Sequence, residues 1–526
     1  MTRKLSLFLA LVLALTAFAG LSTTAIAEAD KVITIMCAEP TTLENVDTCY
    51  ATTYLEERMG AEFVFNFLPS SEWTTKLEIM VTANEELSDV LFGTTNELIV
   101  SKYGANGTFQ DLTPLYNEHS VYMKEAFEAN PEYQKLLTFA DGKMYSAGRL
   151  QQQTHTDFSY KLFLNKVWMD NLGIKSPETL DEFTEMLRAF RDKDPNGNGQ
   201  ADEIVITGQG TGSYNPFYFI MGSFTFVNTR DWFQVNDGVL NLCYTTEGWK
   251  EGLKYLNGLY EEGLIDPLMF TQDLNQLKAV MQKEGDNIVG VAGAMNGSHL
   301  FTVNEKMLDY VGTSPFKGPD GTQWAPYQTY TVTHNGFVTK DAKDPVLAFQ
   351  LLDLCWEKDA SMVIRYGEEN VDWKWAGEDA VGMFEAAGYP ATFELLTGVQ
   401  SGVQNKWWNV WSPMYLDYTI GNGWAEDFEP LNNQRLAYNT VALLIDYVPE
   451  ADKVAGKITY TADESNEIAE IQTNLNSYFK EAMCLFVIGD MDVEADWDEY
   501  IEELEALGMN EYLEIAQTAY TRTWGE

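Results

Sequence analysis

Oxygen-bearing side chains recur at nearly every second position in one short segment of the chain. Glycines at 197 and 199 separate them and allow the backbone to curl tightly. Ca²⁺ takes roughly 6–8 oxygen ligands, and an EF-hand loop supplies one of them from the backbone carbonyl at its seventh position. The sequence therefore predicts a calcium loop whose ligands are Asp194, Asn196, Asn198, Gln200 through its backbone, Asp202 and Glu203.

This loop differs from an EF-hand at the position of its bidentate acid. An EF-hand carries Glu at position twelve, where this chain has Val205, so Glu203 is the candidate for that role. The apolar run 204–206 follows and predicts a strand in place of a second helix. The alternative interpretation is an Asn-Gly turn between a helix and a strand, with no bound ion.

The N-terminus has the pattern of a secretory signal peptide. Arg3 and Lys4 precede an apolar stretch over 5–19, and small residues at 25–27 are typical of a cleavage site. The stretch is shorter than the about 18 apolar residues that a membrane-spanning helix needs. We expect residues 1–27 to be removed and the mature protein to be secreted or extracytoplasmic, at the cell surface or in the periplasm.

The net charge of the chain excludes some classes of binding partner. Beyond residue 27 the sequence holds 32 Lys and Arg against 79 Asp and Glu, a net charge of −47. Phosphate-bearing partners would be repelled, so we expect no binding to nucleic acid and a neutral ligand. With 45% hydrophobic and 13% aromatic residues the chain can build a large core, and its length predicts two or more lobes.

Cysteine and histidine usage argues against several chemistries. Five widely spread cysteines do not form a disulfide framework, and Cys37 with Cys49 is the only close pair. The bridging of that pair is left open. The four histidines show no metal spacing and there is no Gly-x-Ser-x-Gly motif, so zinc chemistry and a serine triad have no support.

Strands and helices alternate along the chain, which predicts parallel sheets with helices on their faces, an α/β fold. The expected strands are 32–36, 61–68, 89–92, 158–164, 203–207, 288–292 and 336–339. The expected helices are 53–59, 73–86, 96–103, 166–172, 181–190, 246–263, 272–283 and 345–366, with a mostly helical tail from 459.

Ligands of such sheets bind outside the carboxyl ends of the strands. That rule places Glu39, Ser70, Trp73 and the turn 93–95 at a cleft. Five of the 14 tryptophans fall within residues 373–411, and a Trp face suits a sugar ring. Each single Trp can equally be core. The predicted ligand contacts are Glu39, Trp73, Asp89, Arg149, Trp373, Trp407, Trp408 and Trp411.

Four segments together resemble the extracellular solute-binding proteins of ABC sugar importers, in particular the large oligosaccharide- and alginate-binding type. They are PETLDEF at 177–183, DPNGNGQADE at 194–203, LYEEGLIDP at 259–267 and YGEENVDW at 366–373. In the last segment Asn370 stands where the family usually has Gly. Most members from Gram-positive bacteria are lipoproteins, and this chain has no lipid-attachment cysteine after its apolar stretch.

The resemblance implies two α/β lobes of the periplasmic-binding-protein type II fold, joined by crossing hinge strands and closing on the ligand. Residues 28–156 and 331–395 would form the first lobe, and 157–330 and 396–526 the second. In the alginate-binding members the 194–203 pattern holds calcium, and we expect a structural ion here because the loop lies inside one lobe.

The leading hypothesis is a non-enzymatic, monomeric receptor that binds an oligosaccharide and delivers it to the permease subunits of an ABC transporter. A secreted polysaccharide hydrolase or lyase is the alternative, since 79 acids allow a catalytic carboxylate pair. A sensor or adhesion subunit that passes its ligand to a membrane partner is a third hypothesis.

Overall fold

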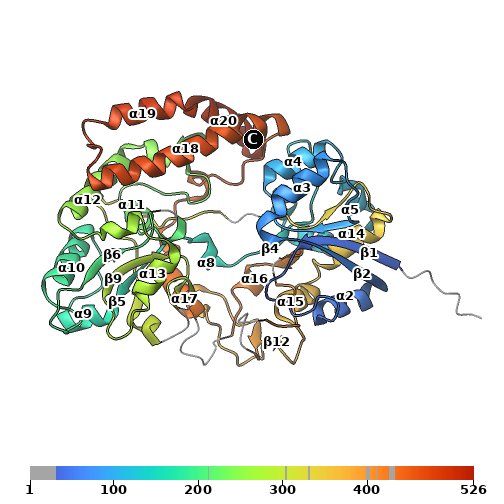
Figure 1. The fold of residues 1–526 in the computed structure, drawn as a ribbon, viewed down its shortest axis with the longest axis horizontal. Coiled ribbons are helices and arrows are strands. Elements are labelled where there is room, and N and C mark those ends of the chain that lie inside the picture. The colour runs from blue at the N-terminus through green and yellow to red at the C-terminus, as the bar shows by residue number, and fades with distance from the viewer. Residues whose placement is uncertain are drawn as a thin grey trace, which may run out of the picture.

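The computed structural model describes residues 31–210, 212–301, 305–329, 332–397, 403–409, 411–425 and 433–525. The predicted signal peptide lies outside these ranges. The described chain forms two lobes side by side, with a layer of C-terminal helices above them (Figure 1). None of the described helices is both long and apolar enough to cross a membrane.

The first lobe is built on a four-stranded sheet in the order β11-β3-β1-β2. The first three strands of the chain are parallel and β11 is antiparallel to β3. All three parallel strands therefore end at the same edge, which Figure 1 shows facing the second lobe. The strands are β1 (Lys31–Ala38), β2 (Ala61–Leu68), β3 (Val90–Phe92) and β11 (Phe337–Val338).

Helices cover both faces of this sheet, as the alternation predicts. They are α2 (Tyr50–Met59), α3 (Trp73–Thr82), α4 (Glu97–Ala105), α5 (Thr113–His119), α6 (Tyr122–Ala129), α7 (Glu132–Leu137), α14 (Pro345–Leu354) and α15 (Lys358–Tyr366).

The second lobe holds a mixed sheet in the order β10-β5-β9-β6. β6 and β9 are parallel, and β5 runs antiparallel to β9. Its strands are β5 (Lys161–Asn165), β6 (Ile204–Thr207), β9 (Val289–Ala294) and β10 (Tyr310–Gly312). Its main helices are α9 (Lys166–Leu172), α10 (Leu180–Asp192), α12 (Glu247–Glu261) and α13 (Leu274–Met281), and a β7–β8 hairpin (Phe233–Asn236, Val239–Leu242) lies beside them.

The chain crosses between the lobes in segments that are hydrogen-bonded to one another. β4 (Arg149–Gln151) pairs in parallel with β14 (Met414–Leu416), and Arg149 also forms an antiparallel bridge with Thr333. Short helices continue two of the crossings, α8 (Thr154–Asp157) and α16 (Tyr418–Gly421). The two-lobed type II fold with crossing hinge strands is thus what the chain adopts.

The chain makes its last crossing from the first lobe to the second later than residue 395, the boundary that the resemblance implies. Trp408, Met414, Leu416 and Trp424 belong to the hydrophobic core of the first lobe. The next helix, α17 (Asn433–Val441), contacts β10 of the second lobe. Residues 403–409 and 411–424 therefore belong with the first lobe, because the aromatic residues there are part of its core.

Three C-terminal helices, α18 (Ala462–Ile488), α19 (Trp497–Ala506) and α20 (Met509–Trp524), lie over the second lobe and reach toward the first (Figure 1). α18 packs on α12 and also contacts α4 of the first lobe. The connector 454–461 that precedes α18 therefore runs through the space between the lobes.

The predicted helix 345–366 is two helices, because the chain turns at residues 355–357. Trp356 is buried at this turn, stacked on Tyr415 at 5.4 Å between ring centroids, and Glu357 is extended. Burying that ring redirects the backbone.

Asn370 stands where the family usually has Gly. It has φ 61°, in the left-handed region that favours Gly, and Asn is among the few other residues that tolerate this conformation.

Cys37 and Cys49 are both buried with free thiols in the core of the first lobe. Burial raises the pKa of each thiol. Neither side chain therefore carries the reactive thiolate that exchange chemistry requires.

Candidate ligand cleft and metal loop

The predicted calcium loop connects the end of α10 to the start of β6. Asp194 has φ 47°, and Gly197 and Gly199 have φ 71° and 74°, so the backbone curls three times through the left-handed region. This curl turns backbone amides inward. Those of Asn198 and Gly199 donate to the Asp194 carboxylate at 3.1 and 3.0 Å.

The side chains of the loop converge on one carboxylate. The amide nitrogens of Asn196 and Asn198 donate to Oδ1 of Asp202 at 3.2 and 3.1 Å, and Lys283 lies 3.6 Å from its other oxygen. The hydrogen bond from Asn198 is the main reason that the pKa of Asp202 is lowered. The carboxylate is therefore held ionised at the centre of the loop.

Glu203 has a side-chain oxygen whose hydrogen-bonding capacity is not satisfied by its neighbours. Its Oε1 is buried and has no hydrogen-bond partner. Burial raises the pKa of this carboxyl, and the nearby carboxylates of Asp202 and Asp194 raise it further. A half-buried acid with one buried oxygen, beside two other acids, is an arrangement that a cation stabilises.

The donor set fits an oxygen-preferring cation. Within the described part of the chain no three His, Cys, Asp or Glu side chains already surround one metal position. Here two of the donors are amides, and rotating each amide by 180° would present its oxygen where the nitrogen now lies. Since β6 starts at this loop and ends at the hinge side, the loop lies at the opposite end of the strand from the cleft.

Three of the predicted ligand contacts are structural parts of the first lobe. Trp373 and Trp408 are fully buried, and their indole N–H groups donate to the Gly367 carbonyl at 2.9 Å and to Thr52 Oγ1 at 2.8 Å. Asp89 accepts backbone N–H groups of Thr34 and Lys343 at 2.8 and 2.7 Å. Burial alone would raise the pKa of Asp89, but the hydrogen bond from the Thr34 hydroxyl at 2.5 Å, together with these backbone bonds, more than offsets burial and the pKa is lowered.

Two more tryptophans are almost buried. Trp73 lies against Gly93, where a side-chain Cβ would collide with the ring, so the turn after β3 needs glycine there. Its indole N–H is buried without a partner. Trp407 is also buried, with the Lys406 ammonium 5.8 Å from its ring.

The remaining three predicted contacts reach solvent. Glu39 is exposed directly after β1, where its carbonyl accepts the Ser70 hydroxyl at 2.6 Å. Arg149 is half-buried in the hinge strand β4. Trp411 is half-buried and stacks on Trp408 with 5.9 Å between ring centroids. The structure thus brings Glu39 and Arg149 toward the interlobe space from two different elements.

Residues at the strand ends of the second lobe were missed by the sequence analysis. Tyr214 follows β6 and His299 follows β9, and their rings lie 5.6 Å apart, both half-buried. His299 Nδ1 is buried without a partner, and burial lowers the pKa of the ring. The strand-end rule applied to β6 and β9, and not only to the first lobe, would have found them.

A buried lysine ties these strand ends to the hinge. Lys161 Nζ donates to the carbonyls of His155, Phe158 and Met295 at 2.7, 2.5 and 2.9 Å. Three carbonyl acceptors match the three donors of an ammonium. The start of β5, the end of β9 and helix α8 are thereby held together.

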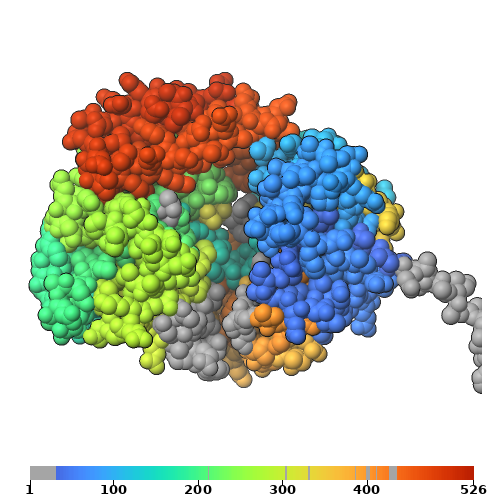
Figure 2. Space-filling model, in the orientation of Figure 1, coloured from blue at the N-terminus to red at the C-terminus, as the bar shows by residue number. Residues whose placement is uncertain are grey.

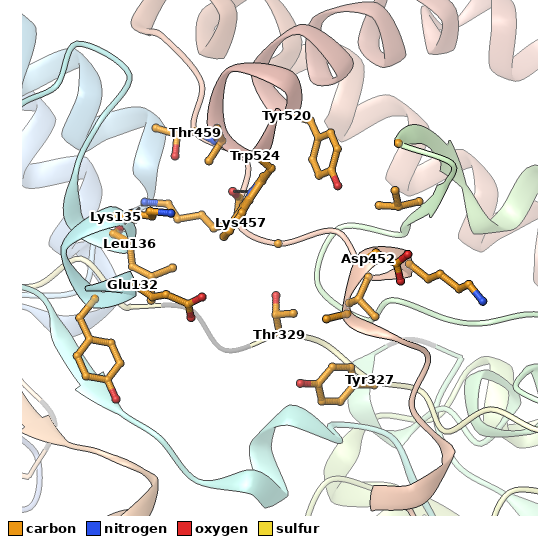
Figure 3. A pocket seen from close by; sticks show the side chains of 18 of the residues that line it. Glu132, Lys135, Leu136, Tyr327, Thr329, Asp452, Lys457, Thr459, Tyr520 and Trp524 are labelled. Atoms are coloured by element: carbon orange, nitrogen blue, oxygen red, sulfur yellow. Dashed lines mark hydrogen bonds between the residues drawn. The ribbon is translucent and has the colours of Figure 1, made fainter. Parts of the chain in front are cut away.

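The two lobes enclose space between them. Figure 2 shows a hollow between the first lobe and the second, below the C-terminal helices. A pocket of about 860 Å³ lies between α7, the hinge and α20 (Figure 3). None of the eight predicted contacts lines that pocket.

These features define a two-lobed binding protein of the kind that holds a solute between its lobes. The chain belongs to the bacterial extracellular solute-binding protein family, whose family model matches residues 47–362. Family membership favours solute binding over the hydrolase or lyase alternative, and it agrees with the resemblance drawn from the four segments.

Among its relatives is the fructooligosaccharide ABC transporter substrate-binding protein FusA of Streptococcus pneumoniae, 24% identical over 81% of this chain and 78% of the relative. The polygalacturonan/rhamnogalacturonan-binding protein YtcQ of Bacillus subtilis is 23% identical over 72% of this chain and 70% of its own.

Solved structures share the fold. FusA in complex with kestose has a TM-score of 0.76 at 21% identity, covering 94% of this chain and 99% of FusA. A human-milk-oligosaccharide (HMO) binding protein of Bifidobacterium longum infantis has a TM-score of 0.81 at 18% identity, covering 95% of this chain and all of that one. Another FusA structure is an EF-hand mutant, and one of the alginate-binding protein AlgQ2 is without calcium ion.

Proposed function

We propose that this protein is an extracytoplasmic receptor that closes its two lobes on an oligosaccharide and delivers it to an ABC importer. The observation that carries the proposal is the geometry of the two sheets. The parallel strands of the first lobe end toward the second lobe, a hollow lies between the lobes, and hydrogen-bonded crossing segments join them (Figures 1 and 2). The sugar class is supported by two relatives, a fructooligosaccharide ABC transporter substrate-binding protein and a polygalacturonan/rhamnogalacturonan-binding protein.

The contacts that we propose for the sugar come from both lobes and the hinge. Glu39 and Arg149 would hydrogen-bond hydroxyl groups, and Trp411 would stack on a ring face. Tyr214 and His299 supply the opposing aromatic wall. These side chains are exposed or half-buried before ligand arrives, which a binding surface requires.

Calorimetry of the mature chain against a panel of neutral and acidic oligosaccharides tests the proposal. We expect one class to bind and the radius of gyration to fall on binding as the lobes close. Tight binding of peptides or amino acids, with no binding of any glycan, would refute the sugar assignment. A reducing-sugar assay on the same panel separates retention from turnover, and turnover would favour the hydrolase.

We further propose that the loop at 194–203 holds a structural calcium ion. Glu203 and Asp202 would supply carboxylate oxygens, Asp194 a third, and Asn196 and Asn198 their amide oxygens after rotation, with Gln200 contributing its carbonyl. The unsatisfied buried oxygen of Glu203 supports this. The ion would stabilise the junction of α10 and β6 and touch no sugar.

We also propose that the protein is a monomer and that it delivers its ligand to permease subunits. Sedimentation tests the monomeric state, and co-purification with the permease tests the delivery.

A further inference from the structure

The hinge contains a hydrogen bond that joins one lobe to the other. The Tyr418 hydroxyl at the start of α16 donates to Oδ2 of Asp157 at the end of α8, at 2.7 Å. Phe158, the next residue after Asp157, packs in the core of the second lobe, whereas Ile420 of α16 packs in the core of the first. A rotation of one lobe against the other would therefore change this contact.

Other contacts hold α8 and α16 side by side around this bond (Figure 1). The Thr154 N–H donates to Oδ1 of Asn422 at 2.9 Å, and the Asn422 side-chain amide donates to the Thr154 hydroxyl oxygen at 2.7 Å. A Cβ added at Gly421 would collide with the Gln152 carbonyl, so the two backbones approach too closely for a side chain there. Of these three hydrogen bonds, the one from Tyr418 ends on an ionisable carboxylate.

Asp157 is buried although it carries a carboxyl group, and the residue is 4% exposed. A second crossing segment also covers it, because the Gln328 N–H donates to the Asp157 backbone carbonyl at 3.0 Å. Tyr418 contacts the carboxylate and also lines the pocket between the lobes. A small displacement of α16 would therefore admit water from the pocket to the carboxyl group of Asp157.

The titratable groups around Asp157 come from each element packed on it. On β5, burial lowers the pKa of Lys161, and the charge of Asp157 raises it in part. In the crossing segment, burial and then the Asp157 carboxylate raise the pKa of Tyr327 to about 12. Tyr418 faces it from α16. His155, on α8 itself, is buried on the side of Lys161, whose charge adds to burial in lowering the pKa of the histidine.

Lys161 is the counter-charge of Asp157. Its three bonds to backbone carbonyls need the three N–H donors of an ammonium, so the lysine is protonated in this arrangement. Burial raises the pKa of Asp157 to about 7, although the Tyr418 hydroxyl and the Lys161 charge lower it in part. A carboxyl group in water has a pKa of about 3.9. Since the buried carboxyl binds its proton more tightly, low pH stabilises the contact of α8 with α16 and high pH weakens it.

We propose that Asp157 is a proton switch in the hinge. While its carboxyl group is protonated, the contact of α8 with α16 keeps the lobes in the arrangement seen here. When it ionises, the proton leaves to water that enters from the pocket, the two helices separate and the lobes open. This proposal rests on the hinge and not on the oligosaccharide receptor function.

Small-angle X-ray scattering of the ligand-free mature chain at pH 5.5 and pH 8.0 tests the switch. We expect a larger radius of gyration at pH 8.0, because full exposure of the carboxyl group would shift the equilibrium toward the open arrangement by up to about thirtyfold between these pH values. Asp157→Asn has nearly the same shape, still accepts the Tyr418 hydroxyl and cannot ionise. Its radius of gyration should stay small at both pH values.

Two further variants separate the switch from other effects. Tyr418→Phe keeps the ring but removes the donor, so it should open at a lower pH than the unmodified chain. Asp141→Asn is the matched control, since Asp141 accepts the Tyr145 hydroxyl at 2.5 Å within the first lobe. It should keep the full response to pH. Thermal melts confirm that each variant is folded.

The proposal is overturned if the radius of gyration of the unmodified chain is the same at both pH values. It is also overturned if Asp157→Asn keeps the response, which would assign the response to Lys161 or a histidine, or if Asp141→Asn abolishes it. A response to pH that depends on Asp157 in a protein that binds no glycan would reject the receptor function and leave the switch standing.

Discussion

The ammonium of Lys457 lies 3.2 Å from the carboxylate of Glu97 and donates to the Leu136 carbonyl at 2.6 Å. Lys457 belongs to the connector before α18, and Glu97 begins α4 in the first lobe. The ammonium is also 5.4 Å from the Phe139 ring, and the lysine side chain is 7% exposed. This ion pair between a buried lysine and a partly buried glutamate thus joins the connector before the C-terminal helices to the first lobe, in addition to the contact of α18 with α4.

Lys457→Met should destabilise the protein by about 2 kcal/mol, because it leaves Glu97 partly buried without its partner. Urea denaturation measures the change. The double variant Glu97→Gln with Lys457→Met should recover part of the loss. Lys453→Met, in the same connector but exposed beside Glu450, is the matched control and should have little effect. Equal losses for both lysines would contradict a specific anchor.

Chelation of calcium should lower the melting temperature while oligosaccharide affinity, measured well below that temperature, stays the same. An ion bound only by the folded state stabilises it by about 2.7 kcal/mol at a hundredfold excess over its Kd. Asp202→Ala should reproduce the effect in excess calcium. Asp192→Ala is the control, since that carboxylate pairs with Arg191 at 2.7 Å outside the loop. Loss of sugar binding with an unchanged melt would instead place the ion in the cleft.

His155→Phe should stabilise the protein more at pH 5 than at pH 7.5. Both ring nitrogens of His155 are buried without partners. Burial, together with the charges of Lys161 and His299, lowers the pKa of the ring to about 3. A base whose pKa is lowered by folding contributes full stability above its unfolded pKa of about 6.5 and loses it as the pH falls.

At pH 5, protonation of His155 in the unfolded chain lowers the free energy of unfolding of the wild-type protein by about 2 kcal/mol. The phenylalanine variant does not lose this stability, because phenylalanine takes up no proton. Urea unfolding of both proteins at the two pH values gives the comparison. All other titratable groups are present in both proteins, so their contributions to the pH dependence cancel when the two free energies of unfolding are subtracted. A free-energy difference that does not change with pH would show that the pKa of His155 is the same in the native protein as in the unfolded chain, and would contradict the prediction.

Trp408→Ala and Trp411→Ala should affect different properties. Trp408 is fully buried against the rings of Phe63, Phe65 and Phe92, at 5.7 to 6.4 Å between centroids, so its removal should cost about 3–5 kcal/mol of stability. Trp411 is half-buried, and its removal should cost less stability but weaken oligosaccharide binding about tenfold. Denaturation and calorimetry on both variants separate the roles, and an unchanged affinity for Trp411→Ala would remove it from the sugar site.

The sequence by itself determined the features that depend on neighbours along the chain. β2 and α9 have the predicted bounds, because residue spacing and caps act within one element. The predicted calcium loop is equally local. Its candidate ligands lie within ten residues, and glycines at 197 and 199 set the curl, so the pattern alone indicates the convergence.

Only the tertiary structure decided which aromatic residues meet solvent. Trp408 is buried because its N–H reaches Thr52, 356 residues earlier in the chain, and no local pattern encodes that contact. Trp524 follows the ordinary spacing of an amphipathic helix, yet its ring packs on Gly456 of the connector and lines the same pocket as Tyr327. Burial and site geometry depend on surfaces brought together from distant segments, whereas periodicity reports only which face of an element is apolar.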